Sequence, residues 1–143
     1  MNLGTEGVRM GVAELKRLMA DAFPQSNGIG EIEAVGVRSA RLRHRVTESD
    51  LRPGETLSGP VMMALADFAF YVALLASIGP KTLAVTTSFN INFLRKPSRA
   101  DLIAEARILR LGRQLAVGEV RIFSEGLERP VANAMVTYAI PAS

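Results

Sequence analysis

The chain has 143 residues, of which 48% are apolar and 22% charged, a composition typical of one ordinary globular domain. It contains no cysteine, which excludes disulfides, thiolate metal sites and a cysteine nucleophile. The net charge of +3 suits an anionic partner, but the arginines are scattered with few aromatic residues between them, which argues against nucleic-acid binding. The single histidine, His44, lies among arginines whose charge favours its neutral form, and we expect it at a strand surface rather than in catalysis. We expect a cytoplasmic protein with no secretory signal, no metal and no separate cofactor.

The first expected element is an amphipathic helix over residues 11–23. Apolar residues recur there at helical spacing, and Pro24 ends the pattern. Residues 32–46 then predict two short strands or one bent strand. The polar stretch 47–56 predicts a loop.

An apolar run follows, from Gly59 to Pro80, in which Asp67 is the only charged residue. Ser58 is a good N-cap, and Pro60 lies in the first turn, where a helix tolerates proline. Because the run is apolar on every side, it predicts a helix that is buried all round. A membrane span is the alternative, but the central carboxylate, the abundance of alanine and the lack of a basic flank argue against it.

The rest of the chain is β in character. Alternating apolar and polar residues, separated by turns, predict four long strands over residues 82–95, 101–111, 114–124 and 130–140. A helix that is apolar on all faces needs a sheet that curls around it, so the expected fold class is α+β. No linker, repeat or low-complexity tract interrupts the chain. The sequence therefore predicts a single domain over residues 1–143, with residues 1–29 as an N-terminal helical extension.

Asp67 is the outstanding candidate for chemistry. No basic residue lies near it in the sequence, and a buried carboxylate without a partner is strongly disfavoured. It must therefore be paired, open to a cleft, or functional; the structural alternative is a hydrogen bond to a hydroxyl such as that of Tyr71, one turn further on. Either Thr86 or Thr87 could orient a water against Asp67 from the adjacent strand, although threonine is also simply at home in a strand.

Two groups of residues suit an anionic ligand. The helix start Ser58-Gly59-Pro60-Val61 presents backbone N–H groups at the positive end of the helix dipole, which suits an oxyanion; the alternative is that Ser58 is only a cap. The cations Arg95 and Lys96, with Arg110 and Arg113 in later turns, suit phosphate groups. Such clusters are also common in solvated turns.

Several of these features together resemble the PaaI-like hotdog thioesterases of the 4-hydroxybenzoyl-CoA thioesterase superfamily. Ser58-Gly59-Pro60 followed by Asp67 in Leu65-Ala66-Asp67 is similar to the His-Gly-Gly…Asp helix of that family. The later stretches that match it are Asn90-Ile91-Asn92-Phe93-Leu94-Arg95-Lys96-Pro97, Gly112-Arg113 and Val131-Ala132-Asn133-Ala134. The resemblance covers roughly residues 30–140 and rests on the order and spacing of these motifs.

The resemblance implies a hotdog fold, in which an antiparallel sheet wraps around the central helix and the chain assembles as a homodimer, often as a dimer of dimers. It implies hydrolysis of an acyl-CoA thioester, with Asp67 as the general base or nucleophile. The family's polarising backbone amide falls near Gly59, and its water-orienting hydroxyl falls on Thr86. The remaining residues expected at the substrate are Arg52, Ser58, Pro60, Val61, Thr87, Arg95 and Lys96.

This sequence departs from the family pattern at three positions. Ser58 stands where the family has histidine, Pro60 replaces the second glycine and removes an N–H donor, and Arg52 stands where the family has asparagine. The N–H of Gly59 or of Val61 is then the expected donor to the thioester carbonyl. The departures leave a non-catalytic acyl-CoA-binding protein as the alternative function.

The spacing of Gly59 and Asp67 predicts a shared site. The two residues are eight positions apart, which is about 12 Å along a helix at roughly 1.5 Å per residue. One chain therefore cannot bring both groups to one thioester, whereas two chains can if their helices run antiparallel across a two-fold axis.

Overall fold

The computed structural model describes residues 7–142, so residues 1–6 of the expected N-terminal extension and Ser143 lie outside the described residues. The elements in chain order are helix α1 (Val12–Ala22), strands β1 (Glu31–Gly36), β2 (Ser39–His44), β3 (Leu51–Arg52) and β4 (Thr56–Leu57), helix α2 (Gly59–Ile78), and strands β5 (Val85–Phe93), β6 (Leu102–Leu111), β7 (Leu115–Ser124) and β8 (Ala132–Ala139). Single turns of 3₁₀ helix cover Pro24–Ser26 and Glu48–Asp50. Both expected helices and all four expected long strands are confirmed.

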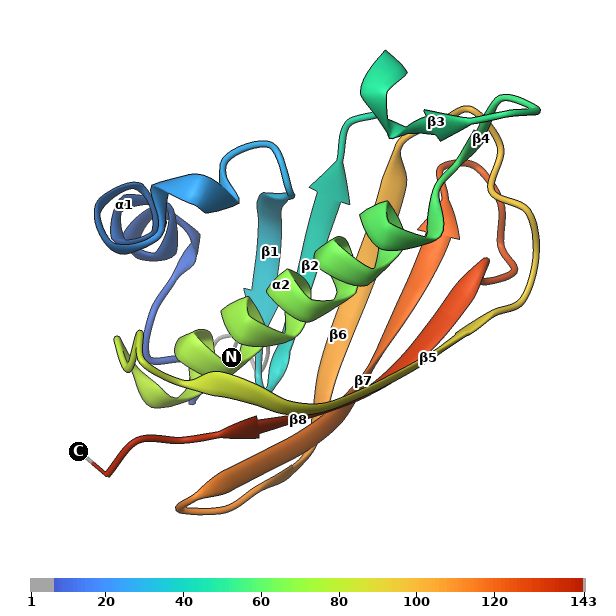
Figure 1. Cartoon of the computed structure of the whole chain (residues 1–143). Helices are drawn as coiled ribbons and strands as arrows, with labels where there is room; N and C mark the ends of the chain where they lie inside the picture. The colour runs from blue at the N-terminus through green and yellow to red at the C-terminus, as the bar shows by residue number, and fades with distance from the viewer. Residues whose placement is uncertain (1–6, 143) are drawn as a thin grey trace.

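Six strands form one antiparallel sheet in the order β1-β2-β6-β7-β8-β5. The short strands β3 and β4 pair separately as a hairpin. Helix α2 lies across the sheet, which curves around it (Figure 1). This is the hotdog arrangement, and it confirms the α+β fold class. The sheet curls because its inner face must cover a helix that has no polar face of its own.

Helix α2 begins after Ser58 and ends at Gly79, whose φ of 98° suits glycine and stops the helix. Ser58 occupies the N-cap position, but its side chain makes no capping hydrogen bond. Among the described residues, α2 is the one helix long and apolar enough to cross a membrane; in this fold it is the core helix, most of it buried. Its approach to the sheet is close: a Cβ added at Gly118 would lie 2.6 Å from the ring of Phe70.

The N-terminal extension packs against the core through helix α1. Leu15 and Met19 are its buried residues, at the four-residue spacing of one helix face. Beyond the helix, the ring of Phe23 meets the rings of Phe68 and Tyr71 edge-on, with centroids 6.0 and 6.1 Å apart. The extension therefore adds an aromatic side chain to the surface of α2.

The expectation that His44 lies at the surface is wrong. The residue is 7% exposed, with Nδ1 2.8 Å from the carbonyl oxygen of Ile29 and Nε2 2.7 Å from Asp50 Oδ2. Burial raises the pKa of Asp50, but hydrogen bonds from His44 and from the Thr47 N–H outweigh it and hold the pKa below its usual value. The ring of His44 thus lies between a backbone carbonyl and a carboxylate in the interior, and not at a strand surface.

Candidate active site

Asp67 lies half-buried near the middle of α2, on the side that faces β5 and β8. The Thr86 hydroxyl donates to Asp67 Oδ1 at 2.7 Å, and the Tyr138 hydroxyl donates to the same oxygen at 2.9 Å. Oδ2 accepts no hydrogen bond from residues 7–142. One carboxylate oxygen is therefore held by two neutral donors, and the other remains able to take a proton from a reacting molecule.

The pairing of β5 with β8 decides which side chains reach Asp67. Thr86 lies opposite Tyr138 in the register, so both side chains project from the same face of the sheet toward α2. The register then shifts between Thr86 and Ser88, and the Thr87 hydroxyl donates to the carbonyl of Thr137 at 3.3 Å instead. The structure thus brings Thr86, and not Thr87, to the carboxylate.

The expected structural alternative for Asp67 was a hydrogen bond from Tyr71. Tyr71 instead donates to the carbonyl oxygen of Thr82 at 2.8 Å. Its place at the carboxylate is taken by Tyr138, a residue that the sequence analysis did not single out. The only sequence signal for it is strand alternation, which places Tyr138 on the same inner face as Val136 and Ala134.

Tyr138 is suited to act as a permanent donor. Burial, together with the negative charge of Asp67, raises the pKa of its phenol above the usual value. The phenol therefore keeps its proton at neutral pH. Its hydroxyl also lies 3.2 Å from the main-chain carbonyl oxygen of Asp67, so it fixes both the backbone and the side chain of that residue.

A cavity of about 410 Å³ opens beside Asp67. Its polar residues are Asp67, Thr82, Thr86 and the hydroxyls of two tyrosines, and the rest of its wall is apolar. The lining residues are Ala22, Phe23, Ile29, Ala64, Asp67, Phe68, Tyr71, Thr82, Ala84, Val85, Thr86 and Tyr138. A mostly apolar cavity with one carboxylate and a few hydroxyls suits a ligand with an apolar tail and one reactive polar group.

The expected oxyanion donors lie elsewhere in the chain, at the start of α2. There the N–H of Met62 donates to the carbonyl of Ser58, and Pro60 has no N–H, which leaves the N–H groups of Gly59 and Val61. Gly59 packs against Phe93: a Cβ added at Gly59 would lie 3.2 Å from that ring. Within one chain the helix start and Asp67 are therefore not brought together.

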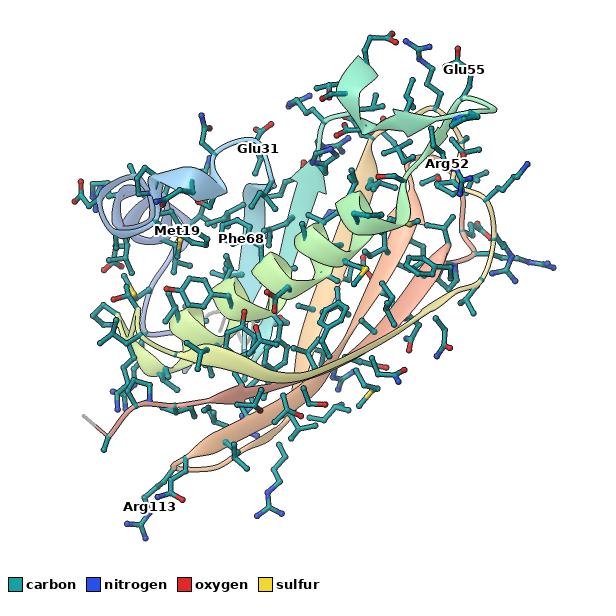
Figure 2. The ribbon with its side chains drawn as sticks, in the orientation of Figure 1. Met19, Glu31, Arg52, Glu55, Phe68 and Arg113 are labelled. Carbon is teal, nitrogen blue, oxygen red and sulfur yellow. The ribbon has the colours of Figure 1, made fainter. Side chains whose placement is uncertain are left out.

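The expected substrate-binding cations also lie away from Asp67. Arg52 is exposed in strand β3, near the start of α2 in Figure 2. Arg95 and Lys96 are exposed just beyond the end of β5, where Arg95 Nη1 donates to the carbonyl of Pro130 at 2.7 Å. Phe93 is seven residues after Thr86 in that strand, which is about 23 Å at roughly 3.3 Å per residue.

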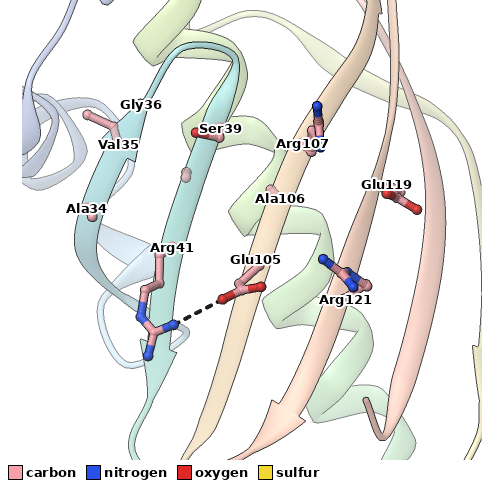
Figure 3. Close-up of a pocket in the computed structure, with 11 residues that line it drawn as sticks. Ala34, Val35, Gly36, Ser39, Arg41, Glu105, Ala106, Arg107, Glu119 and Arg121 are labelled. Atoms are coloured by element: carbon pink, nitrogen blue, oxygen red, sulfur yellow. Dashed lines mark hydrogen bonds and ion pairs between the residues drawn. The ribbon is translucent and has the colours of Figure 1, made fainter. Parts of the chain in front are cut away.

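A second hollow, on the outer face of the sheet, has a different character (Figure 3). Cations and carboxylates alternate across it, and Arg41 Nη1 lies 3.1 Å from Glu105 Oε2. Arg107 lies opposite Glu119 in the register of β6 with β7. Since opposite charges neutralise one another and remain hydrated there, this face offers no counterpart to the lone carboxylate of Asp67.

No group of three or more His, Cys, Asp or Glu side chains that could hold a metal ion occurs within residues 7–142. The absence of a metal and of a cofactor stays a prediction. The chemistry available at Asp67 from this chain is therefore that of a carboxylate and its two hydroxyl donors.

The sequence also matches a protein-family model, that of the thioesterase superfamily, over residues 54–131. The chain belongs to the thioesterase superfamily. Asp67, the helix start and Thr86 fall inside the matched region, whereas Tyr138 and the N-terminal extension of this thioesterase fall outside it. A search of curated proteins finds no match.

Solved structures share the fold of this thioesterase over nearly its whole length. A Silicibacter protein that is classed as a thioesterase is 43% identical, with a TM-score of 0.87 over 99% of this chain and 100% of that one. A Haemophilus influenzae thioesterase is 21% identical, with a TM-score of 0.82 over 98% of this chain and 95% of that one. The E. coli PaaI protein of the phenylacetic acid degradation operon is 22% identical, with a TM-score of 0.78 over 90% and 91% of the two chains. The expected likeness to PaaI-like hotdog thioesterases is confirmed, and the family indicates thioester hydrolysis.

Proposed function

We propose that this thioesterase hydrolyses acyl-CoA thioesters to the free acid and coenzyme A, with Asp67 as the catalytic carboxylate. The observation that carries the proposal is the state of Asp67, whose Oδ1 is held by Thr86 and Tyr138 while Oδ2 accepts no hydrogen bond from the described residues. A carboxylate fixed in this way, at the wall of a mostly apolar cavity, is suited to general-base catalysis.

The proposed reaction uses the carboxylate of Asp67 and the N–H groups at the start of α2. Asp67 Oδ2 takes a proton from water as the water oxygen attacks the thioester carbonyl carbon. The oxyanion of the tetrahedral intermediate accepts hydrogen bonds from the N–H groups left at the start of an α2 helix, by Gly59 and Val61. Collapse of the intermediate breaks the C–S bond, and the proton passes to the departing thiolate. If Asp67 is instead the nucleophile, its carboxylate oxygen displaces the thiolate of coenzyme A and forms a mixed anhydride. Attack of ¹⁸O-water on the Asp67 carboxyl carbon of that anhydride in a single turnover would then label Asp67.

Strand β5 supports assembly into a homodimer. It is the last strand of the sheet, so only one of its edges is paired among residues 7–142 (Figure 1). Its nine residues, Val85–Phe93, include no charge, no proline and no glycine, and Val85 and Phe93 are 57% and 49% exposed. Long edge strands without such protection tend to pair with another chain. We therefore propose that two β5 strands pair antiparallel across a two-fold axis.

This dimer completes the site. Asp67 is bonded to Thr86 near the beginning of β5, and Gly59 packs against Phe93 at its end. Antiparallel pairing of two β5 strands places the beginning of one strand beside the end of the other. Asp67 of one protomer then faces Gly59 of the partner subunit, and each dimer holds two equivalent sites. Arg95 and Lys96 of the partner subunit follow the end of its β5 strand. They therefore lie near Asp67 of the first protomer, although they are far from Asp67 of their own chain. At this shared site they would bind the phosphates of coenzyme A.

The test is a panel of acyl-CoA esters assayed for release of free thiol by the wild type and by Asp67→Asn. The wild type is expected to release thiol, and the variant to lose about a hundredfold or more of the rate while keeping its melting temperature, because general bases contribute on the order of 10²–10⁴. Binding of acyl-CoA without turnover by the wild type would favour a non-catalytic binding protein. Light scattering of the same samples tests the dimer and the dimer of dimers.

A further inference from the structure

Another hollow borders the Asp67 cavity. It occupies about 490 Å³ between helix α1 and strand β1, and its wall combines apolar residues such as Met19, Pro24 and Ile32 with the polar residues Lys16, Ser26, Asn27 and Glu31. In Figure 2 the labelled side chains of Met19 and Phe68 lie on facing elements, α1 and α2. Phe68 lines both this hollow and the Asp67 cavity. The two spaces are therefore neighbours that share one aromatic wall.

The partition between them contains Phe68, against which Phe23 packs from the side of the Asp67 cavity. The Phe23 ring lies edge-on to the Phe68 ring, with centroids 6.0 Å apart, and it faces the Asp67 cavity, whereas the next residue, Pro24, lines the other hollow. The backbone holds Phe23 in place at the end of α1: its N–H donates to the carbonyl of Met19, and its carbonyl accepts from the Ser26 hydroxyl at 2.7 Å. The partition is thus one aromatic pair, of which one ring comes from the core helix and the other from the N-terminal extension.

We propose that Phe23 is a specificity-determining residue, which limits the length of the acyl group by closing the far end of the Asp67 cavity. The inference rests on the proposed function, because it takes the Asp67 cavity as the acyl pocket. With the Phe23 ring present, an acyl chain ends within the cavity of about 410 Å³. Without the ring, the cavity continues past Phe68 into the hollow of about 490 Å³, which has room for a longer chain.

Phe23 lies in a different part of the chain from the catalytic residues. Phe23 precedes the region that matches the family model, residues 54–131, whereas Asp67 and Thr86 lie inside it. Acyl length can therefore change through the extension while the reacting groups stay unchanged.

The test measures binding and turnover separately in wild type, Phe23→Ala and Phe23→Leu. Binding is measured as dissociation constants for S-alkyl-CoA thioethers of increasing chain length, which the enzyme cannot hydrolyse. Turnover is measured as kcat/KM for acyl-CoA esters of the same chain lengths. Phe123→Ala is the matched control, since it removes the same ring from a separate surface hollow, lined also by Arg43 and Ile103, that shares no residue with the Asp67 cavity. Phe23→Ala is expected to shift the preferred chain length upward, with the ratio of long-chain to short-chain affinity rising about tenfold or more, and Phe23→Leu less.

Two outcomes would overturn the inference. The first is a chain-length profile that is unchanged in a folded Phe23→Ala protein, and the second is an equal change in Phe123→Ala. Failure of the proposed function looks different, because the wild type would then hydrolyse none of the acyl-CoA esters. The thioether affinities would still report whether Phe23 limits the pocket in that case.

Discussion

The phenol of Tyr138 donates a hydrogen bond of 2.9 Å to Oδ1 of Asp67, although the two residues are 71 positions apart in the chain. Thr86, from the neighbouring strand, donates to the same oxygen. Strands β5 and β8 thus act together as a support for one carboxylate of helix α2. Since both donors bind the same oxygen, they orient the carboxylate and leave its second oxygen for chemistry.

Removal of the threonine donor is expected to impair this orientation. We expect Thr86→Val to lower kcat for acyl-CoA hydrolysis about tenfold, because a hydrogen bond to a charged group contributes roughly 1.5–3 kcal/mol. Thr87→Val is the control, since that hydroxyl donates to the carbonyl of Thr137 rather than to Asp67. Equal rates in the two variants would contradict the assigned role of Thr86.

The tyrosine donor can be tested in the same way. Tyr138→Phe keeps the ring that packs against Phe70 at a centroid distance of 5.4 Å and removes only the hydroxyl. We expect kcat to fall about tenfold with little change in KM, since the acyl pocket keeps its shape. Tyr71→Phe, which removes a hydroxyl bonded to the carbonyl of Thr82, should affect stability more than kcat. A Tyr138→Phe enzyme with the wild-type kcat would show that Thr86 alone suffices.

Mixed dimers test the shared site. Asp67→Asn removes the base, and Gly59→Pro removes the N–H at the helix start, so each homodimer should be inactive. In an equal mixture about half of the dimers are mixed, and each has one intact site, so activity should recover to about a quarter of the wild-type value. Native mass spectrometry of differently tagged chains verifies that mixed dimers form. No recovery despite their formation would refute the arrangement.

Charge removal beyond β5 tests coenzyme A binding. We expect Arg95→Gln with Lys96→Gln to raise KM for CoA esters while KM for short pantetheine thioesters, which lack the nucleotide phosphates, stays the same. Arg121→Gln, in strand β7 on the outer face of the sheet, serves as a control for the loss of a surface cation. Equal losses on both substrate types would place Arg95 and Lys96 at the acyl part of the substrate instead.

The stability of the fold should fall in acid, in part through Asp101. The Val46 N–H lowers the pKa of Asp101, burial opposes this, and Arg43 lowers it further, with a net shift below the usual value. The stabilisation is therefore complete above the unfolded-state pKa of about 3.9 and is lost as the pH falls below it, through the lower folded-state pKa. We expect Asp101→Asn to be less stable than wild type at pH 7 and to approach it below about pH 3 in urea unfolding. Glu128→Gln, at an exposed residue with no ion pair among the described residues, serves as the control for removal of a surface carboxylate.

The sequence by itself determined the two helices, the four long strands and the position of the lone carboxylate, Asp67, in the apolar helix. An apolar run with one carboxylate predicts a buried helix, because no face of it is polar, and the alternating stretches after it predict a sheet that covers it. The motif order around Ser58 and Asp67 was enough to indicate the family. These are local patterns, and local patterns depend on residues close together in the chain.

The tertiary structure alone decided which side chains surround Asp67. Tyr138 reaches it through the register of β5 with β8, the register shift after Thr86 turns Thr87 away, and Tyr71 is engaged by Thr82. His44 is buried because Asp50, in a turn that the sequence showed only as a polar loop, supplies its partner. Strand pairing and loop closure join residues far apart in the chain, and their geometry depends on register shifts and packing that residue type does not encode locally.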